Sequence, residues 1–173
     1  YGYYKIYVDG SLGGRGAYFS EPYNDAPEIC GAMIHTPEEI EECKAYLALN
    51  REIRHIIAGG ELYRIASWHH DRHAAFEFVL PDRSEALLFV FSHALQYGEQ
   101  LPNIRLQGLD PQTSYTIECH GKKAVRDFYH QNTTLEAPER MTGRGLAEIG
   151  IHVPLEGDFD SRIYHLKADS AKV

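Results

Sequence analysis

The chain has 173 residues, of which 43% are hydrophobic and 24% charged, and its formal net charge is -8. This length can bury a full domain core, and an aromatic content of 12% argues against a disordered chain. The acidic balance, without a basic stripe, argues against nucleic acids and acidic membrane surfaces as partners. The apolar runs are too short to cross a bilayer, and the absence of a basic, hydrophobic opening segment argues against an export signal.

The three cysteines, Cys30, Cys43 and Cys119, are widely spaced and form no CxxC pair. A scattered, odd set is typical of a protein in a reducing compartment and argues against a disulfide framework or a zinc knuckle. The sequence therefore predicts a cytoplasmic location, and it indicates no cofactor.

Residues 1–35 contain one predicted strand, over residues 1–8, then a glycine-rich stretch over residues 10–16 and a loop rich in Pro, Asn and Asp. A phosphate-binding loop is one interpretation of the glycines, but no Lys-Ser/Thr pair follows them and no helix pattern begins there. The residues favour a flexible loop with positive-φ glycines.

Residues 36–60 predict one long helix. Thr36 suits the N-cap, Pro37 the first helical position, and Glu39 completes a T-x-x-E capping box. Acidic residues follow at the positive end of the helix dipole, and Gly59 and Gly60 are expected to end the helix.

Residues 61–173 change to short β-rich runs. Strands are predicted over residues 62–68, 74–80, 85–93, 104–106, 115–119 and 161–166. Residues 81–84, Pro-Asp-Arg-Ser, form a strong turn signal between two of them. Short strands without intervening helices predict a mainly β fold, an antiparallel β-sandwich preceded by the helix and by a barrel-like strand and loop segment.

The densest set of candidate metal ligands is His69, His70 and His73, with Asp71 between them. Three imidazoles and a carboxylate could bind zinc if the backbone turned them inward. Neighbouring residues on a strand point to opposite faces, however, and polar residues between two strands are typical of a solvated hairpin loop. Both interpretations stay open.

Other constellations are weaker. Tyr63 and Trp68 could stack on a sugar ring, although aromatic residues at strand spacing are more often part of a core. No two carboxylates are linked across a predicted cleft as a glycosidase requires, and no G-x-S-x-G motif occurs. The residues alone therefore predict a module without a self-contained catalytic centre.

The chain from about residue 37 to residue 168 resembles the C-terminal region of family-36 glycoside hydrolases, the α-galactosidases. The matching segments occur in the family's order, at residues 52–57, 60–65, 82–87, 104–111 (I-R-L-Q-G-L-D-P), 115, 141–143 and 157–161. The resemblance implies that the predicted helix is the last helix of a catalytic (β/α)8 barrel and leads into a non-catalytic C-terminal β-sandwich.

The same resemblance implies which partners to expect. The family's catalytic carboxylates lie on barrel strands within K-x-D-x-N and S-D-N-like motifs, and neither motif stands in this sequence. No catalytic residue is therefore carried over. The implied partners are a catalytic barrel that this chain lacks, α-galactoside sugars bound by the parent enzyme, and a second copy of the chain in a homo-oligomer.

Residues 1–40 resemble a different family. The segments at residues 5–17, 21–25 and 31–39 are similar to a barrel segment of metal-dependent amidohydrolases. In that family a lysine matching Lys5 is carboxylated and bridges metals, but the H-x-H strand and the later ligands are missing here. Besides the α-galactosidase domain, two alternatives remain: a fragment or fusion of an amidohydrolase, and a stand-alone carbohydrate-binding or interaction module.

Overall fold

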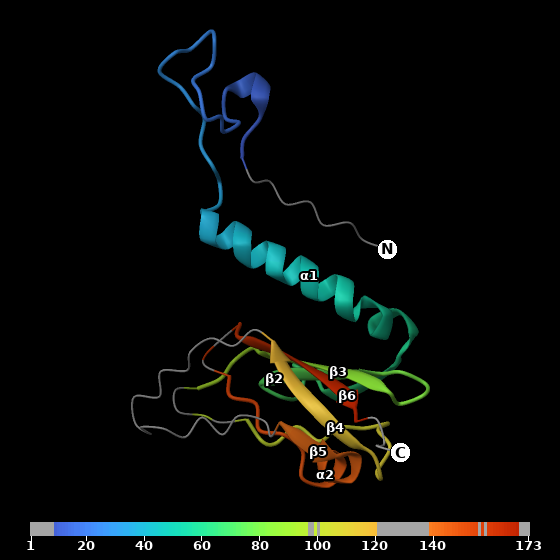
Figure 1. The fold of residues 1–173 in the computed structure, drawn as a ribbon. Coiled ribbons are helices and arrows are strands. Elements are labelled where there is room, and N and C mark those ends of the chain that lie inside the picture. The colour runs from blue at the N-terminus through green and yellow to red at the C-terminus, as the bar shows by residue number, and fades with distance from the viewer. Residues whose placement is uncertain are drawn as a thin grey trace. The chain divides into compact units, whose positions relative to one another are not determined.

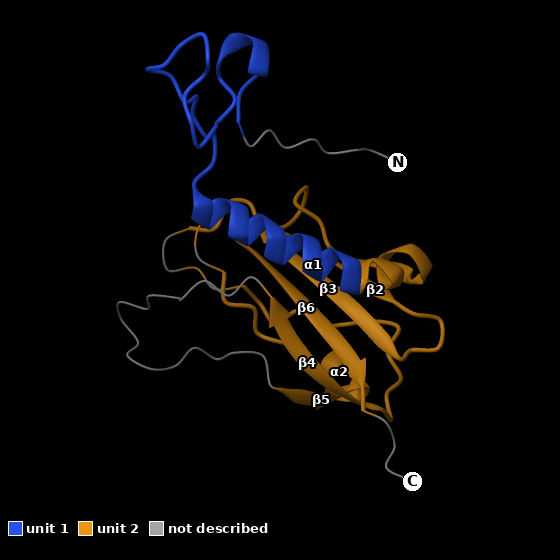
Figure 2. Cartoon of the chain, turned by 45° about the horizontal axis from the view of Figure 1, so that its top comes forward, with its two compact units in different colours: residues 1–52 blue, residues 53–173 orange. Residues whose placement is uncertain are grey.

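The computed structural model describes residues 9–96, 99, 101–120, 139–155, 157 and 159–169 (Figure 1). The chain forms two compact units, Tyr1–Glu52 and Ile53–Val173, and the division falls inside the long helix (Figure 2). The strand expected over residues 1–8, which includes Lys5, lies outside the described residues.

The glycine-rich stretch of the first unit is a tight turn around the 3-10 helix η1, Leu12–Gly14. Its ends are joined by backbone hydrogen bonds from Gly10 N–H to the Gly16 carbonyl and back from Gly16 N–H to the Ser11 carbonyl. The expectation of positive-φ glycines in this stretch is wrong, because the left-handed residue here is Arg15, with φ of 54°. Arg15 takes that conformation because it closes η1, and its N–H donates to the Leu12 carbonyl.

Helix α1, Pro37–Gly59, confirms the predicted helix. The Thr36 hydroxyl accepts a hydrogen bond from Glu39 N–H (3.2 Å), and the Glu39 carboxylate accepts one from Thr36 N–H (2.9 Å), so the capping box is formed. Near the other end of the helix, Ile53 and Ile56 are buried. The described part of the chain contains no helix that is long and apolar enough to span a membrane.

The second unit is built on one antiparallel sheet of six strands in the order β1-β2-β3-β6-β4-β5 (Figure 1). The strands are β1 Glu61–Ala66, β2 His73–Val79, β3 Glu85–Ser92, β4 Ser114–His120, β5 Arg140–Thr142 and β6 Ser161–Ala168. Every neighbouring pair is antiparallel, which confirms the mainly β prediction. The predicted turn at residues 81–84 is also confirmed, because Leu80 N–H donates to the Glu85 carbonyl across it.

The two faces of this sheet have different surroundings. The inner face carries Ala75, Val79, Leu88, Val90 and Tyr164, which are buried in one hydrophobic core. The layer against this face is made of connecting segments and helix α2, Gly143–Glu148, which supply Leu106, Leu146, Ile151 and Val153 to the same core. We call the opposite side the outer face.

In the described part of the chain, the layer opposite this sheet is not a second sheet. The strand expected over residues 104–106 is reduced there to a single bridge. Ile104 and Ile151 exchange two backbone hydrogen bonds of 2.9 Å, and Leu106 N–H donates to the Leu146 carbonyl. Gly150 has φ of +78° beside the Ile104 carbonyl, where a Cβ atom would come within 2.5 Å of that oxygen. This close approach of two backbones fixes the opposing layer without a full strand.

Candidate functional site

The three histidines of the predicted metal cluster are placed in different surroundings. His69 and His70 lie in an exposed turn after β1, whereas His73 is buried on the inner face of β2. Their ring nitrogens do not form a common ligand group in the described part of the chain. Burial lowers the pKa of His73, since a charged imidazole loses its hydration there. Lys5, the remaining metal candidate, is outside the described residues.

The two candidate sugar-binding aromatic residues also separate. Tyr63 packs against the inner-face core, and its hydroxyl donates a hydrogen bond of 2.8 Å to Glu61. Its ring lies against Gly108, where a Cβ atom would come within 2.6 Å of the ring. Trp68, in contrast, is 61% exposed. A sugar platform would therefore depend on Trp68 and on neighbours other than Tyr63.

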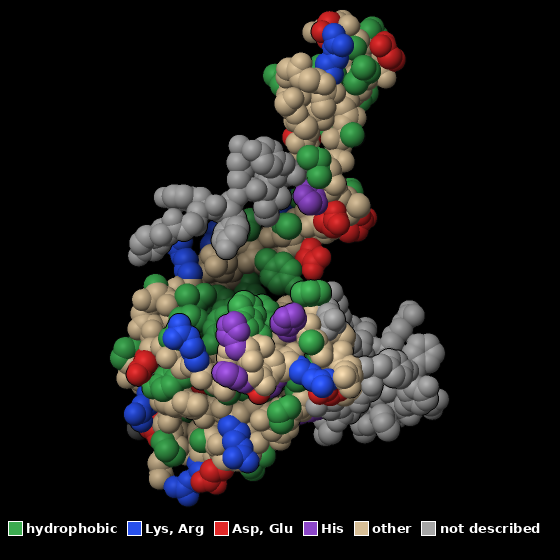
Figure 3. Space-filling model, turned by 180° about the vertical axis from the view of Figure 1, so that it is seen from behind, with side chains coloured by type: hydrophobic (Ala, Val, Ile, Leu, Met, Phe, Trp, Pro, Cys, Tyr) green, Lys and Arg blue, Asp and Glu red, His purple; other side chains and the backbone are tan. Residues whose placement is uncertain are grey.

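Those neighbours form what we call the tryptophan cluster: Trp68, His69, His93 and Phe159. The Trp68 ring meets His69 and His93 edge to face at centroid distances of 5.9 and 6.5 Å. The His93 ring stacks on Phe159 at 6.3 Å, and Phe159 is 86% exposed. Figure 3 shows a face on which hydrophobic side chains and histidines gather.

The outer face carries a second aromatic group, which we call the aromatic face: Phe76, Phe78, Phe89 and Phe91. Phe76 lies directly opposite Phe89 in the ladder between β2 and β3, and their rings stack at 5.2 Å. Phe76 also stacks on Phe91 at 5.7 Å and meets Phe78 edge to face at 6.0 Å. Side chains alternate along a strand, so phenylalanines two residues apart share one side of the sheet. Phe91 remains 40% exposed.

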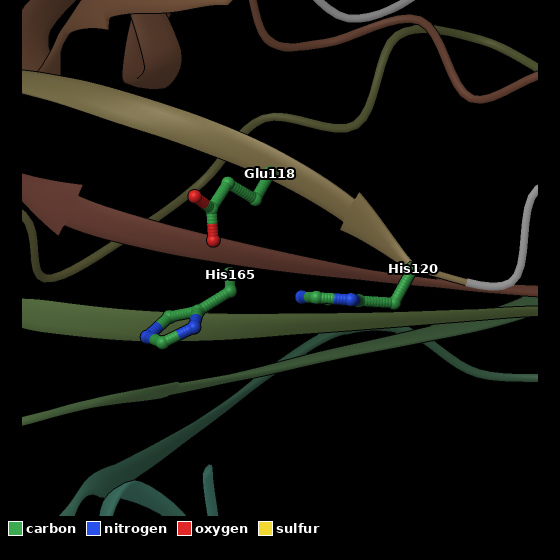
Figure 4. A group of neighbouring side chains, drawn as sticks. All are labelled: Glu118, His120 and His165. Carbon is green, nitrogen blue, oxygen red and sulfur yellow. The ribbon is translucent and has the colours of Figure 1, made fainter. Parts of the chain in front are cut away.

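One group of described residues brings three possible metal ligands together: Glu118, His120 and His165. Glu118 and His120 come from β4 and His165 from β6, and all three side chains lie on one side of the sheet (Figure 4). Their ligand atoms lie within 4.8 Å of one another. The register explains the grouping, because Glu118 is directly opposite His165 and His120 is two residues further along the same face.

A second carboxylate orients this group. His165 is fully buried, and its Nε2 atom is 2.7 Å from a carboxylate oxygen of Glu85. The other Glu85 oxygen is 3.3 Å from Nε2 of His55. Burial acts to raise the pKa of Glu85, but the hydrogen bonds to the two histidines outweigh it and hold that pKa below its ordinary value.

The exposed member of the group also has an ionic partner. Lys167 Nζ donates a hydrogen bond of 3.1 Å to Glu118. This hydrogen bond is the largest cause that lowers the pKa of Glu118, and the charge of Lys167 acts in the same direction. The carboxylate is therefore ionised at neutral pH, as a metal ligand must be.

Glu77 is a buried acid on the inner face of β2. It is fully buried, and one carboxyl oxygen accepts a hydrogen bond of 2.8 Å from Gln107 N–H. Burial raises its pKa to about 8, although that hydrogen bond acts in the opposite direction. The group is mainly neutral at pH 7.

Sequence reasoning missed Glu77, the aromatic face and the Glu118–His120–His165 group. Glu118 lies in the strand predicted over residues 115–119, but His120 falls just beyond its expected end, and only the observed strand β4 includes both and places them on one face. Their partner His165 is 45 positions further along the chain from His120, and only the pairing of β4 with β6 brings it near. The positions of predicted strands in the sequence do not reveal which strands are neighbours in the sheet.

The second unit is similar to a domain of known proteins. Residues 73–166 match the family model described as glycosyl hydrolase family 36 C-terminal domain. A probable α-galactosidase C from Aspergillus terreus is 25% identical over 130 residues, which are 75% of this chain and 15% of that protein. The α-galactosidase AgaA from Geobacillus stearothermophilus is 35% identical over 86 residues, 50% of this chain and 12% of that protein.

The chain is also similar in structure to an α-galactosidase of this family. The crystal structure of the GH36 α-galactosidase AgaB from Geobacillus stearothermophilus aligns with a TM-score of 0.64 and 29% identity. The alignment covers 79% of this chain and 16% of that one. The chain thus spans about a sixth of the length of the proteins that it matches.

Proposed function

This chain belongs to glycosyl hydrolase family 36 through its C-terminal domain, and we propose that it serves an α-galactosidase as a non-catalytic module. The observation that carries the proposal is the family match over residues 73–166, which falls on the sheet and the layer opposite it. In this proposal, hydrolysis of the α-galactoside takes place in a (β/α)8 barrel that the module covers.

The aromatic face supports a covering role. Phe76, Phe78 and Phe89 are half-buried and Phe91 is 40% exposed, so apolar rings remain at the surface on the outer side of the sheet. Burying apolar area gains about 25 cal/mol for each Å² removed from water. We propose that the occupant of this face is the barrel of the α-galactosidase, since the relatives are about six times longer than the matched region.

The experiment has two arms. First, the chain alone is incubated with a nitrophenyl α-galactoside, and no turnover above buffer is expected. Second, Ile53–Val173 replaces the corresponding C-terminal region of the Geobacillus stearothermophilus α-galactosidase AgaA. The chimera is expected to hydrolyse the substrate, whereas AgaA truncated before that region is not.

Variants of the chimera test the docking face. Phe91→Lys is expected to reduce turnover at least tenfold, because a charged side chain would have to be buried against the barrel. Ile149→Lys is the matched control, since Ile149 is an exposed apolar residue outside the aromatic face. Turnover by the chain alone would overturn the non-catalytic role, and equal activity of both variants would overturn the assignment of the face.

A second candidate function is sugar binding by the tryptophan cluster. The exposed rings of Trp68 and Phe159 favour it, because aromatic faces stack on apolar faces of sugars. Chemical shift changes at Trp68 Nε1–H on titration with galactose would support it, and their absence at high sugar concentration would exclude it. A homo-oligomer and a cytoplasmic location are further proposals, and the amidohydrolase resemblance of residues 1–40 stays a prediction.

A further inference from the structure

We propose that Glu118, His120 and His165 form a binding site for a divalent transition-metal ion of the zinc class, which bridges β4 and β6 (Figure 4). The proposal does not depend on the role of the domain in an α-galactosidase. It starts from three side chains on one face of two neighbouring strands, with ligand atoms within 4.8 Å of one another.

The types of ligand select the ion. Two imidazoles and one carboxylate form a mixed nitrogen and oxygen set that suits zinc, whereas magnesium and calcium prefer oxygen ligands alone. Ligand atoms around a tetrahedral zinc ion lie about 3.3 Å apart at bonds of about 2.0–2.1 Å. The ligand atoms, now up to 4.8 Å apart, therefore need to draw in by up to about 1.5 Å when the ion binds.

The surroundings of His165 resemble the support that metal-ligating histidines usually have. Its Nε2 atom lies 2.7 Å from Glu85, so a proton on Nε2 would be donated to that carboxylate and Nδ1 would coordinate the metal. The Glu85 carboxylate is itself oriented by His55. The contact with Glu85 thus orients the ring of the most buried ligand before the ion binds.

The competing interaction is the ion pair of Glu118 with Lys167. The Lys167 ammonium is 3.1 Å from a Glu118 oxygen and would have to move away, or share the carboxylate, when the metal binds. Both side chains are partly exposed, so this pair is weak and its rearrangement costs little. Water would complete the coordination, as in sites with three protein ligands.

The test is a titration of the chelator-treated, dialysed full chain with ZnCl₂ by isothermal calorimetry. One equivalent of zinc is expected to bind, and the thermal midpoint of the chain is expected to rise with ZnCl₂ but not with MgCl₂. His120→Ala and Glu118→Gln are each expected to weaken binding at least tenfold. Glu118 is exposed and His120 is partly exposed, so neither substitution is expected to disturb the fold. Circular dichroism of each variant checks this.

Controls separate this site from the other histidines. His69→Ala and His70→Ala alter exposed imidazoles outside the group and should leave zinc affinity unchanged within twofold. Lys167→Met removes the competing ammonium and is expected to strengthen binding. Failure of zinc to bind at one equivalent would overturn the proposal. Loss of binding in His69→Ala with retention in His120→Ala would overturn it as well, and would assign the metal to the turn after β1.

Discussion

The buried acid Glu77 should make the stability of the domain depend on pH in a way that one substitution removes. The side chain is fully buried among core residues of β2 and its neighbours. In the described part of the chain, Oε2 accepts the Gln107 N–H hydrogen bond and Oε1 has no hydrogen-bond partner. The substitution Glu77→Gln keeps the size of the side chain and an acceptor for Gln107 N–H, but the new amide cannot ionise.

The magnitude follows from the pKa. An increase from an ordinary 4.5 to about 8 in the folded chain corresponds to about 5 kcal/mol, at about 1.4 kcal/mol for each pKa unit. Between these two values the folded carboxyl keeps a proton that the unfolded carboxyl has lost. The free energy of unfolding therefore falls as pH rises through this window, by about 1.4 kcal/mol for each pH unit.

Glu77→Gln should remove that slope. At pH 5 we expect the variant to be less stable by about 1–3 kcal/mol, because its amide brings two buried donors to the place of the carboxyl oxygen without a described partner. From pH 5 to pH 8 the variant should gain about 4 kcal/mol relative to the parent. The two stability curves should therefore cross at a pH between these limits.

The assay is urea unfolding of both chains at several pH values, followed by far-ultraviolet circular dichroism. Fluorescence is less suitable, because the single tryptophan, Trp68, is already 61% exposed in the folded chain. Glu38→Gln is the control, since Glu38 is exposed on α1. Parallel stability curves for Glu77→Gln and the parent would refute the reasoning and show that the buried carboxyl does not carry the pH dependence.

Two further substitutions test the inner face. Tyr115→Phe removes a buried hydroxyl that donates to the Arg83 carbonyl at 3.0 Å and accepts from Asp110 N–H at 3.1 Å. Urea unfolding should show that the variant loses about 1–3 kcal/mol of stability. A loss no larger than that of Tyr46→Phe, which alters an exposed tyrosine, would contradict this. Burial lowers the pKa of His73, so the unfolded chain binds its proton first and stability is lost as pH falls below about 6.5. His73→Leu should lose less stability than the parent between pH 7 and pH 5, and an equal loss would contradict this.

The elements that the sequence predicts well are those with local causes. The capping box of Thr36 and Glu39 and the paired glycines at residues 59 and 60 set both ends of α1 from a few adjacent residues. The turn at residues 81–84 fixes the hairpin of β2 and β3 in the same way. Each signal acts over about four residues, so it can be recognised without knowing the rest of the fold.

The missed elements depend on partners far along the chain. Strand β5 has three residues and exists because it pairs with β4, with Met141 opposite Tyr115. Helix α2 has six residues and begins where Gly143 approaches the Asp110 carbonyl so closely that a Cβ atom would lie 2.1 Å from it. Neither segment has enough residues for a periodic pattern, so tertiary contacts decide both.

The candidate metal ligands show the same dependence on distant partners. His69, His70 and His73 are close in sequence, but a turn followed by a strand sends them to different surroundings. Glu118, His120 and His165 are spread over two strands, but the register of β4 and β6 brings them together. Distance along a β chain is a poor guide to distance in space, because an antiparallel neighbour can come from any part of the sequence.

The aromatic face and the proposed metal site share the outer side of the sheet. Whether docking and metal binding are independent can therefore be tested with variants of each group. The ladder of β3 and β6 places Leu87 opposite His165, and Leu87 is fully buried while Glu118, on the next strand, is exposed. Apolar packing therefore gives way to charged groups between β3 and β4, where an apolar partner would have to desolvate the Glu118 carboxylate. If docking and metal binding are separate, Phe91→Lys should reduce turnover of the chimera and leave zinc affinity within twofold, and Glu118→Gln should do the reverse. A variant that impaired both equally would show that the outer face acts as one site.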